Sequence, residues 1–396
     1  MSTAAGKDVV IVAAKRTPIG AFGGALSSLT APQLGSHVIK AAVDASGLSS
    51  GDVDEVFMGN VVSAGIGQAP TRQAALGAGL PNTVPCTTVN KVCASGMKAL
   101  MFASASIATG HQDVIVAGGM ESMSNVPYYV PKARTGYRYG HGALEDGLLK
   151  DGLWDVYNDQ HMGMCGEKCA KDHSFDRASQ DAYTKASYTR AIEAAKAGKF
   201  ADEIAPMEVK GRKGVTVVDA DEEYGRVDFD KIESLRPAFI KDGTITAANA
   251  SPLSDGASAL VLMSAEAAKA KGLTPLARVR GYGDAAGEPQ DFTTAPALAM
   301  PVALRHAGLQ VSDVDFFECN EAFAVVSQYN MQKLGIAHDA MNVNGGAVSM
   351  GHPIGSSGSR IVVTLLNVLK QRDATIGGAM ICNGGGGASA FVVERL

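Results

Sequence analysis

The sequence predicts an α/β fold built from two related halves, with a further region inserted between them. Runs typical of strands and of helices alternate along the chain, which is the pattern of proteins whose helices cover a sheet. Gly47-Leu48 is followed by Asp52-Val53-Asp54. Gly308-Leu309 is followed by Asp313-Val314-Asp315 at the same spacing, so two halves are expected. A length of 396 residues also exceeds one ordinary core.

The first half begins with an apolar run of strand length at residues 9–14. Residues 87–90 are predicted to end another strand, and residues 94–108 to form a helix with small and apolar side chains on every face. Such a helix is expected to be buried against another helix. Residues 113–120 are predicted to close this half as a strand beside glycines.

Residues 123–253 break the alternation. They hold the only tryptophan, most of the tyrosines and charged helical runs such as residues 178–199, so we interpret them as an inserted domain. The second half then repeats features of the first: Val343-Asn344 and Ser357-Gly358 are counterparts of Val89-Asn90 and Ser95-Gly96. Residues 314–318 and the apolar, glycine-containing stretch 376–393 are predicted strands of this half.

Composition excludes several classes of protein. A net charge of -5 argues against nucleic acid as the main partner, although a local basic patch for an anionic ligand is compatible with it. No apolar stretch approaches the roughly 20 residues of a membrane span. Residues 1–8 resemble neither a signal peptide nor a transit peptide, so we expect a cytoplasmic protein, or a mitochondrial one if a transit peptide has been removed.

The six cysteines are irregularly spaced and are expected to be reduced thiols. Cys165 and Cys169 could share a helix face, but two such ligands make a weak metal site, and we interpret them as buried thiols. Cys93 differs from both, because it is expected at the turn between a strand and the start of a helix. Backbone N–H groups and the helix dipole there favour a thiolate, the nucleophile that attacks a thioester.

Three further stretches carry polar groups beside glycines or at a strand end. His352 lies in the loop Gly351-His352-Pro353-Ile354-Gly355, where an imidazole can accept the proton of Cys93. Asn320 follows a predicted strand, and its carboxamide can hold a water that forms an oxyanion hole with His352. Taken singly, a surface-loop histidine and a turn asparagine are the simpler interpretations.

Cys382 ends a predicted strand and precedes Asn383 and four glycines. A thiol with an ordinary pKa of roughly 8.5 can exchange protons near neutrality. The glycines permit close backbone approach, so the Gly384 N–H can join the Cys93 N–H in a second oxyanion hole. A glycine run is also typical of linkers, but a linker would not lie between two apolar strands.

Together the stretches 90–96, 320–323, 351–355 and 382–387 closely resemble the thiolase family, and within it the potassium-activated acetoacetyl-CoA branch. The resemblance extends from Arg16-Thr17-Pro18-Ile19-Gly20 to the C-terminal strand. It implies two similar α/β halves in five αβαβα layers with an inserted loop domain. The expected limits are 1–122, completed by about 254–274, for the N-terminal half, 123–253 for the loop domain that holds coenzyme A, and 275–396 for the C-terminal half.

The resemblance also implies roles for the reactive groups. Cys93 aligns with the cysteine that carries the acyl group, Cys382 with the base that deprotonates acetyl-CoA, and His352 with the histidine that assists Cys93. The expected reaction is the reversible condensation of two acetyl-CoA to acetoacetyl-CoA and CoA, with isoprenoid biosynthesis by the mevalonate pathway as its setting.

The same resemblance implies where coenzyme A and a cation bind. Ser251 matches the contact to the pantetheine arm, and the other expected ligand contacts are Arg226, Val227, Asp228, Lys231, His161, Met162, Phe292 and Phe323. The expected potassium ligands are Tyr188, Ala247, Ala248, Ala250 and Val348. Backbone carbonyls suit a weakly hydrated monovalent ion. Alternatively, Tyr188 is a packed helix aromatic, and Arg226 and Lys231 are solvated surface charges.

The expected partners are acetyl-CoA, acetoacetyl-CoA and CoA, with no tightly bound cofactor, potassium as activator, no nucleic acid, no membrane and a homotetramer built as a dimer of dimers. One alternative is a broad-chain 3-ketoacyl-CoA thiolase of β-oxidation, which would need a roomier acyl pocket than His161, Met162 and Phe292 suggest. An alternative of another class is a non-catalytic CoA-binding protein. A dithiol redox protein that uses Cys93 and Cys382 would lack the Cys-x-x-Cys motif.

Overall fold

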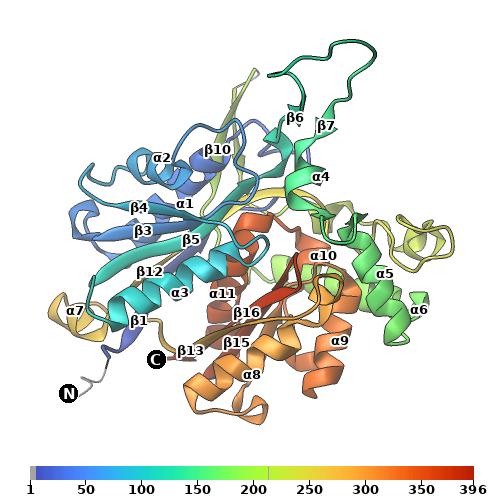
Figure 1. Cartoon of the computed structure of the whole chain (residues 1–396). Helices are drawn as coiled ribbons and strands as arrows, with labels where there is room; N and C mark the ends of the chain where they lie inside the picture. Colours follow the sequence, from blue (N-terminus) through green and yellow to red (C-terminus); the bar gives the residue numbers. More distant parts are fainter. Residues whose placement is uncertain (1–5, 213) are drawn as a thin grey trace.

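The computed structural model describes residues 6–212 and 214–396, so most of the N-terminal stretch considered for a targeting signal lies outside it. Its centre is a long mixed sheet with the strand order β14-β15-β16-β13-β1-β12-β5-β3-β4, to which β2 adds by pairing with β12 (Figure 1). The strands are β1 (Val9–Arg16), β2 (Gly20–Ala21), β3 (Glu55–Gly59), β4 (Cys86–Val89), β5 (Val114–Ser122), β12 (Ser254–Ser264), β13 (Ala277–Ala286), β14 (Phe316–Cys319), β15 (Ile376–Asn383) and β16 (Gly387–Arg395).

This sheet consists of two parts that belong to the two halves of the chain. β1, β3, β4, β5 and β12 form the first part, and β13 to β16 form the second. The parts meet where β1 pairs with β13 through Val10↔Arg278 and Ile11↔Ala277. Each part mixes parallel and antiparallel pairs: β3 runs parallel to β5, and β14 parallel to β15, whereas β15 and β16 are antiparallel. The predicted alternation of two related α/β halves is therefore confirmed.

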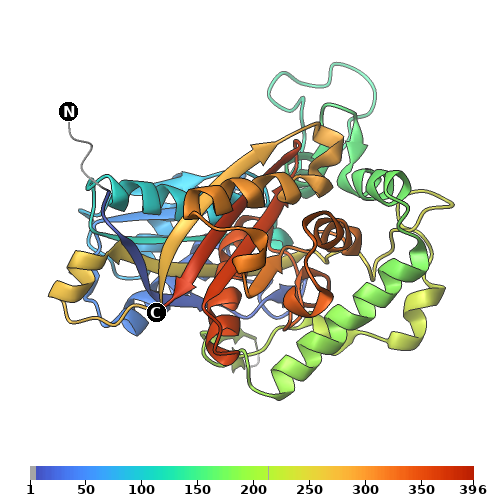
Figure 2. The same cartoon turned by 90° about the horizontal axis from the view of Figure 1, so that it is seen from below.

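Helices separate and cover the two sheet parts (Figure 2). α3 (Ser95–Ala108) and α11 (Ile354–Gln371) pack against each other and contact strands of both halves. α1 (Ala31–Ser46) and α2 (Pro70–Gly77) cover the outer face of the first part, and α8 (Pro296–Ala307), with α9 (Ala324–Leu334) beside it, covers the second. The short α7 (Ala265–Ala270) follows β12. The layers therefore follow the expected order αβαβα.

The central pair of helices explains why residues 94–108 carry so many small side chains. A Cβ at Gly96 would lie 2.6 Å from Ser359 Oγ on α11, so a larger residue there would push the two helices apart. Most of α3 is buried, including Met97, Leu100 and Ala103. The prediction that this helix is buried against another is confirmed, and the close approach places the start of α3 near the start of α11.

Between β5 and β12 the chain leaves the sheet and forms a separate region. Its helices are α4 (Gly147–Gly152), α5 (Met162–Asp172) and α6 (Arg177–Lys196), and its short turns are η2 (Met123–Asn125), η3 (Glu223–Arg226) and η4 (Phe229–Ser234). Three small strand pairs join them, namely β6 (Tyr128–Tyr129) with β7 (Glu145–Asp146), β8 (Trp154–Asp155) with β9 (Gln160–His161), and β10 (Met207–Gly211) with β11 (Gly214–Val218). The segment between β6 and β7 projects from the body of the molecule (Figure 1).

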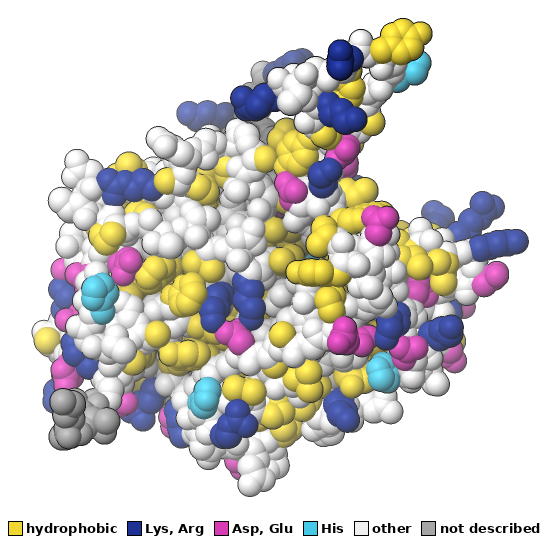
Figure 3. All heavy atoms as spheres, in the orientation of Figure 1, with side chains coloured by type: hydrophobic (Ala, Val, Ile, Leu, Met, Phe, Trp, Pro, Cys, Tyr) yellow, Lys and Arg dark blue, Asp and Glu magenta, His cyan; other side chains and the backbone are white. Residues whose placement is uncertain are grey.

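The surface fits the modest net charge. Acidic and basic side chains are interspersed over the face seen in Figure 3, and the projecting segment adds hydrophobic and basic ones. Within residues 6–212 and 214–396, no helix combines the length and apolar character needed to cross a membrane.

Candidate active site

A cavity of about 270 Å³ opens where the two halves and the inserted region meet. Its walls contain nine of the residues that the sequence predicted for catalysis, ligand binding or cation binding, namely Cys93, His161, Met162, Ala250, Ser251, Phe292, Phe323, His352 and Gly384. Asn320 and Cys382 lie behind these walls and are fully buried. The structure thus brings the four predicted motifs to one place.

Cys93 lies in a strained turn between β4 and α3. The preceding residue, Val92, has a φ of +48°, which is rare for a β-branched side chain. Two polar side chains hold this turn: Asn90 Oδ1 accepts from Val92 N at 2.9 Å, and Ser95 Oγ accepts from Lys91 N at 2.8 Å. Ser95 Oγ also donates to the Val92 carbonyl at 2.6 Å. Strain of this kind persists only where surrounding bonds fix the backbone.

The surroundings of Cys93 oppose the thiolate that the sequence predicts there. Burial raises the pKa of the Cys93 thiol to about 12, and the N–H groups of Gly384 and of Cys93 itself lower it only in part. Loss of solvation outweighs the dipoles at the start of α3. The unliganded site therefore holds a neutral thiol, and the nucleophile needs a base when it reacts.

His352 lines the same cavity as Cys93 and is the predicted base. It lies in the loop before α11, and its Nδ1 is 2.6 Å from Ser357 Oγ. Ser357 donates its own hydrogen to the Pro353 carbonyl at 3.0 Å, so its oxygen accepts from His352. Burial, and next the charge of Arg360, lower the pKa of His352 to about 3. The imidazole is therefore neutral, with Nε2 available as an acceptor.

Asn320 faces this Nε2 atom. Its Nδ2 lies 3.4 Å from His352 Nε2, and its backbone N–H donates to the Met380 carbonyl on β15 at 3.0 Å. Asn320 directly follows β14, which runs parallel to β15, so the sheet fixes the carboxamide beside the Cys382 strand. A carboxamide and an imidazole that lie this close together can both contribute to binding a developing oxyanion.

Cys382 is the penultimate residue of β15 and is fully buried. Burial, and next the neighbouring Cys93, hold the pKa of Cys382 well above its ordinary value. The strand turns back into β16 through Gly385 and Gly386, both with φ of +86°, so the glycine run lies between two strands of the stretch 376–393. This turn leaves no room for a side chain at Gly386, where a Cβ would lie 2.4 Å from the Gly287 carbonyl.

The rest of the cavity wall is apolar. Met162 at the start of α5, Phe292 in the turn η5 (Pro289–Thr294) and Phe323 before α9 line it. His161 stacks on Phe239 with 4.7 Å between ring centroids, and Phe239 contacts Phe323 edge-on. Burial lowers the pKa of His161, in keeping with this apolar setting. Such walls suit a short acyl group.

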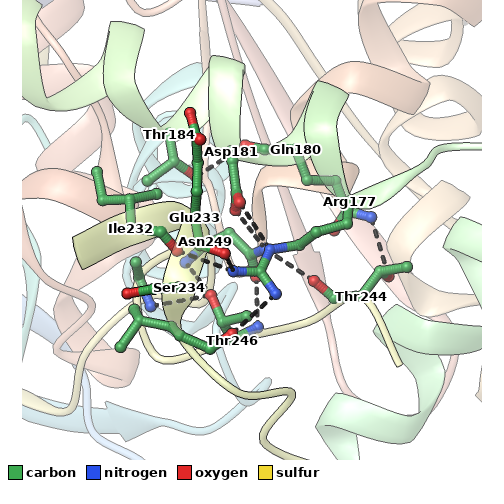
Figure 4. Close-up of polar contacts among 12 residues, drawn as sticks. Arg177, Gln180, Asp181, Thr184, Ile232, Glu233, Ser234, Thr244, Thr246 and Asn249 are labelled. Carbon is green, nitrogen blue, oxygen red and sulfur yellow. Dashed lines mark hydrogen bonds and ion pairs between the residues drawn. The ribbon is translucent and has the colours of Figure 1, made fainter. Parts of the chain in front are cut away.

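Ser251 and Ala250 form the cavity rim and are tied to the stretch that holds Asn320. Ser251 donates to the Ala322 carbonyl through both its N and its Oγ, each at 3.0 Å, and Ala250 forms a bridge with Phe323. Figure 4 shows the polar contacts that anchor the same loop to α6 and η4 of the inserted region. Asn249 Nδ2 donates to the Thr244 carbonyl at 2.9 Å and approaches Asp181 Oδ1 at 3.4 Å.

Asp181 continues this network from α6. It pairs with Arg177 Nε at 2.7 Å, and Arg177 also donates to the Ile232 carbonyl of η4 at 2.8 Å (Figure 4). The loop that carries Ser251 is thereby connected to α6 and η4. The predicted nucleotide contacts lie in this outer part.

These nucleotide contacts are Arg226, Val227, Asp228 and Lys231, and they lie outside the cavity walls, in and between η3 and η4. Arg226 pairs with Glu223 at 3.4 Å, and Lys231 with Asp228 at 2.8 Å. Both basic side chains are well exposed, so each can leave its local partner for a phosphate at small cost.

The predicted cation ligands come from three segments. Tyr188 is buried on α6 and packs edge-on against Phe229 with 6.5 Å between centroids. Burial, and next Glu223 and Glu321, raise the pKa of Tyr188 to about 12, so its hydroxyl stays protonated. Val348 lies in α10 (Ala347–Met350), which packs against α6. Ala247 and Ala248 belong to the loop before Ser251.

Two important residues were not predicted as site residues. Ser357 contacts His352 Nδ1. The available signal in the sequence was a serine five residues after His352, in the first turn of the following helix. Glu321 is a buried hub that accepts from Tyr183 Oη and Ser187 Oγ at 2.8 Å, from Asn342 Nδ2 at 2.9 Å and from Val348 N at 3.0 Å. It follows Asn320 in the sequence, and a carboxylate inside so apolar a stretch was the available signal.

Comparison with known proteins identifies the family. Residues 9–266 match the family described as Thiolase, N-terminal domain, and residues 273–395 match Thiolase, C-terminal domain. The chain is 58% identical over 98% of both lengths to acetyl-CoA acetyltransferase 2 of Arabidopsis thaliana. It is 56% identical to acetyl-CoA acetyltransferase of Schizosaccharomyces pombe, over 98% of this chain and 99% of the relative.

A solved structure is similar as well. A thiolase from Ascaris suum in complex with coenzyme A superposes with a TM-score of 0.94 at 44% identity, over 98% of this chain and 100% of that one. Both parts of the family pattern are thus matched across nearly the whole length, on a fold of the same arrangement. This chain belongs to the thiolase family.

Proposed function

We propose that this protein is an acetyl-CoA C-acetyltransferase, which condenses two acetyl-CoA to acetoacetyl-CoA and CoA and also runs the reverse reaction. The observation that carries the proposal is the meeting of Cys93, His352, Cys382 and the Gly384 N–H around one short, apolar cavity. The names of the relatives from Arabidopsis thaliana and Schizosaccharomyces pombe support the same activity.

In the first half-reaction, His352 Nε2 takes the proton of Cys93 while the sulfur attacks the thioester carbonyl. The tetrahedral oxyanion lies against the N–H groups of Cys93 and Gly384, which already act on the Cys93 sulfur. The carbon–sulfur bond to CoA then breaks, and CoA leaves with a proton from Cys382. The products are acetyl-Cys93, CoA, a Cys382 thiolate and a protonated His352.

This charge pair explains how two poorly solvated groups can ionise. Burial alone holds the pKa of Cys382 high and that of His352 low, so each charged form is disfavoured by itself. Formed together in the same water-poor site, thiolate and imidazolium stabilise each other. The resulting thiolate is a strong base because its protonated form is favoured.

In the second half-reaction, Cys382 removes a methyl proton from a second acetyl-CoA. The enolate oxygen is stabilised by His352 with Asn320, whose amide lies 3.4 Å from the imidazole. The carbon attacks acetyl-Cys93 to form acetoacetyl-CoA, and the Cys93 thiolate takes back the proton from His352. All groups return to their starting protonation states.

Coenzyme A is proposed to run from Ser251 at the rim to Arg226, Val227, Asp228 and Lys231 on the inserted region. The complex of the Ascaris suum thiolase with coenzyme A supports this ligand. Potassium is proposed to bind Tyr188 and the carbonyls of Ala247, Ala248, Ala250 and Val348.

We also propose that the N-terminal half comprises residues 1–122 with 254–274, the inserted loop domain residues 123–253, and the C-terminal half residues 275–396. We further propose that the protein forms a homotetramer and has a cytoplasmic role in isoprenoid biosynthesis.

The test follows the acetyl group. Brief incubation with acetyl-CoA or acetoacetyl-CoA, acid quench and peptide mass spectrometry should locate it on Cys93. Label found on Cys382 instead would reverse the two thiol assignments. Steady-state rates on acetoacetyl-CoA should exceed those on a longer 3-ketoacyl-CoA, because Met162, Phe292 and Phe323 close the cavity. A preference for the longer substrate would favour the broad-chain alternative.

A further inference from the structure

A cluster of charged and hydroxyl side chains joins the two halves beside the catalytic turn, the residues 90–95 that carry Cys93. Asp284 on β13 pairs with Lys91 Nζ and with Lys98 Nζ, each at 2.5 Å. Ser389 Oγ on β16 donates to the same carboxylate at 2.6 Å. Lys91 belongs to the catalytic turn and Lys98 to α3, whereas Asp284 and Ser389 belong to the second half.

Lys91 reaches further than the ion pair. Its Nζ also donates to Ser389 Oγ at 2.8 Å and to the Ala388 carbonyl at 3.2 Å. In the antiparallel pairing of β15 with β16, Ala388 lies directly opposite Cys382. Asp284 lies opposite Ser389 on the other side of β16. Lys91, two residues before Cys93, is therefore hydrogen-bonded to Ala388, the residue that pairs with Cys382.

The catalytic turn needs such a bond to the second half. Val92, between Lys91 and Cys93, has the left-handed φ of +48°. Asn90 and Ser95 hold this turn from within the first half. Lys91 is the member of the turn whose side chain is bonded to the second half, and Gly384, which donates toward the Cys93 sulfur, follows Cys382 on that half.

We propose that Lys91, paired with Asp284, is a positioning residue that holds the Cys93 turn in register with the Cys382–Gly384 turn. The inference rests on the proposed acetyl transfer, because it assigns Lys91 a part in that reaction without contact to the substrate. Effective transfer needs the sulfur of Cys93 within reach of both the Gly384 N–H and the Cys382 thiol. A displacement of about 1 Å can cost about 100-fold in rate.

Lys98 provides a matched control. Both lysines pair with Asp284 at the same distance, and both side chains are 25% exposed. They differ in that Lys98 lies on α3 and not in the catalytic turn. Removal of either lysine leaves Asp284 with the other lysine and Ser389, so its carboxylate always keeps a positively charged partner. A general loss of charge would affect the two variants equally, whereas a positioning role would not.

The experiment measures single-turnover acetylation of Cys93 at several acetyl-CoA concentrations in wild type, Lys91→Met, Lys98→Met and Lys91→Arg, with thermal unfolding of each. We expect the maximal rate of Lys91→Met to fall about 100-fold, with half-saturation within about threefold of wild type because the pantetheine rim is untouched. Lys98→Met should stay within about threefold of wild type, and Lys91→Arg should recover most of the loss because it keeps the cation.

The outcomes separate the two proposals. Wild-type protein that carries no acetyl group on Cys93 would contradict the proposed function itself. Acetylated wild type with an equally fast Lys91→Met would overturn the positioning role, as would equal losses in the two methionine variants. Should Lys91→Met fail to fold, Asp284→Asn removes the carboxylate charge with little change of shape. A wild-type rate in that variant would also overturn the proposal.

Discussion

Ser357 Oγ lies 2.6 Å from His352 Nδ1 and fixes which ring nitrogen carries the proton. The serine hydrogen is directed to the Pro353 carbonyl, so the serine oxygen is an acceptor and Nδ1 must be the donor. Nε2 is then the basic nitrogen, and it is the one that Asn320 faces. A hydroxyl buried in the first turns of α11 thus makes His352 a base at the atom that the cavity needs.

Ser357→Ala should therefore slow the enzyme as well as destabilise it. Without the hydroxyl, a buried N–H of the imidazole loses its acceptor, at a cost of about 1–3 kcal/mol, and the other tautomer becomes competitive. We expect kcat to fall about tenfold, since the general-base step supplies roughly 10²–10⁴-fold in all. Ser359→Ala, which removes a buried hydroxyl bonded to Ser258 at 2.6 Å, is the control. Equal losses in both variants would deny Ser357 an orienting role.

The alkylation of Cys93 should depend steeply on pH. Burial raises its pKa to about 12, so the thiolate fraction grows about tenfold per pH unit at every pH well below that value. Iodoacetamide labelling of Cys93, followed peptide by peptide between pH 7 and pH 9, should rise at that rate. A plateau that begins below pH 8 would show a stabilised thiolate and would restore the expectation based on the helix start.

The sequence predicts the position of Cys93 better than its surroundings. The sequence placed Cys93 correctly at the start of α3, because a strand end, a polar turn and a run of small residues are local features. It could not reveal that Cys93 would be half-buried in a largely apolar cavity. Its solvation depends on residues far away in the chain, such as Gly384 and Met162, which line the same cavity.

The fold itself followed from patterns that are repeated along the chain. Alternating elements and the duplicated Gly-Leu and Asp-Val-Asp signals indicated two α/β halves, which the sheet order bears out. The glycine run 384–387 was expected between two apolar strands, and the structure has its turn there, at Gly385 and Gly386. The contacts of Glu321 and of Lys91 were beyond reach, since each joins segments that periodicity cannot pair.

Cys382→Ser should separate the two half-reactions. A serine hydroxyl is a far weaker acid than a thiol, so its alkoxide is scarcely available as a base for the methyl proton. Attack by Cys93 on acetyl-CoA needs His352 instead, and another proton source can serve the departing CoA. The variant should still acetylate Cys93 but lose at least about 100-fold in condensation. Quenched labelling measures the first step and acetoacetyl-CoA formation the second, and equal losses would contradict a dedicated base.

Potassium should activate the enzyme by ordering the loop that carries Ser251. Tyr188 on α6, Val348 in α10 and the loop at Ala247, Ala248 and Ala250 come from three segments that a single cation would draw together. A loop ordered in advance loses less entropy on binding, roughly 0.5–1.5 kcal/mol per immobilised side chain. We therefore expect KCl to lower the KM for CoA substrates, by about tenfold for each 1.4 kcal/mol of binding free energy that the ordered loop contributes.

Sodium, which is smaller and more strongly hydrated, should replace potassium poorly, so the decisive measurement is a rate titration with KCl against NaCl at constant ionic strength. Tyr188→Phe should weaken the potassium response if the hydroxyl is a ligand, because the neutral oxygen is lost while the ring keeps its packing on Phe229. Tyr282→Phe, on β13 and stacked on Phe391, is the matched control. Superimposable KCl and NaCl curves would remove the cation from the site and leave Tyr188 as a packing residue.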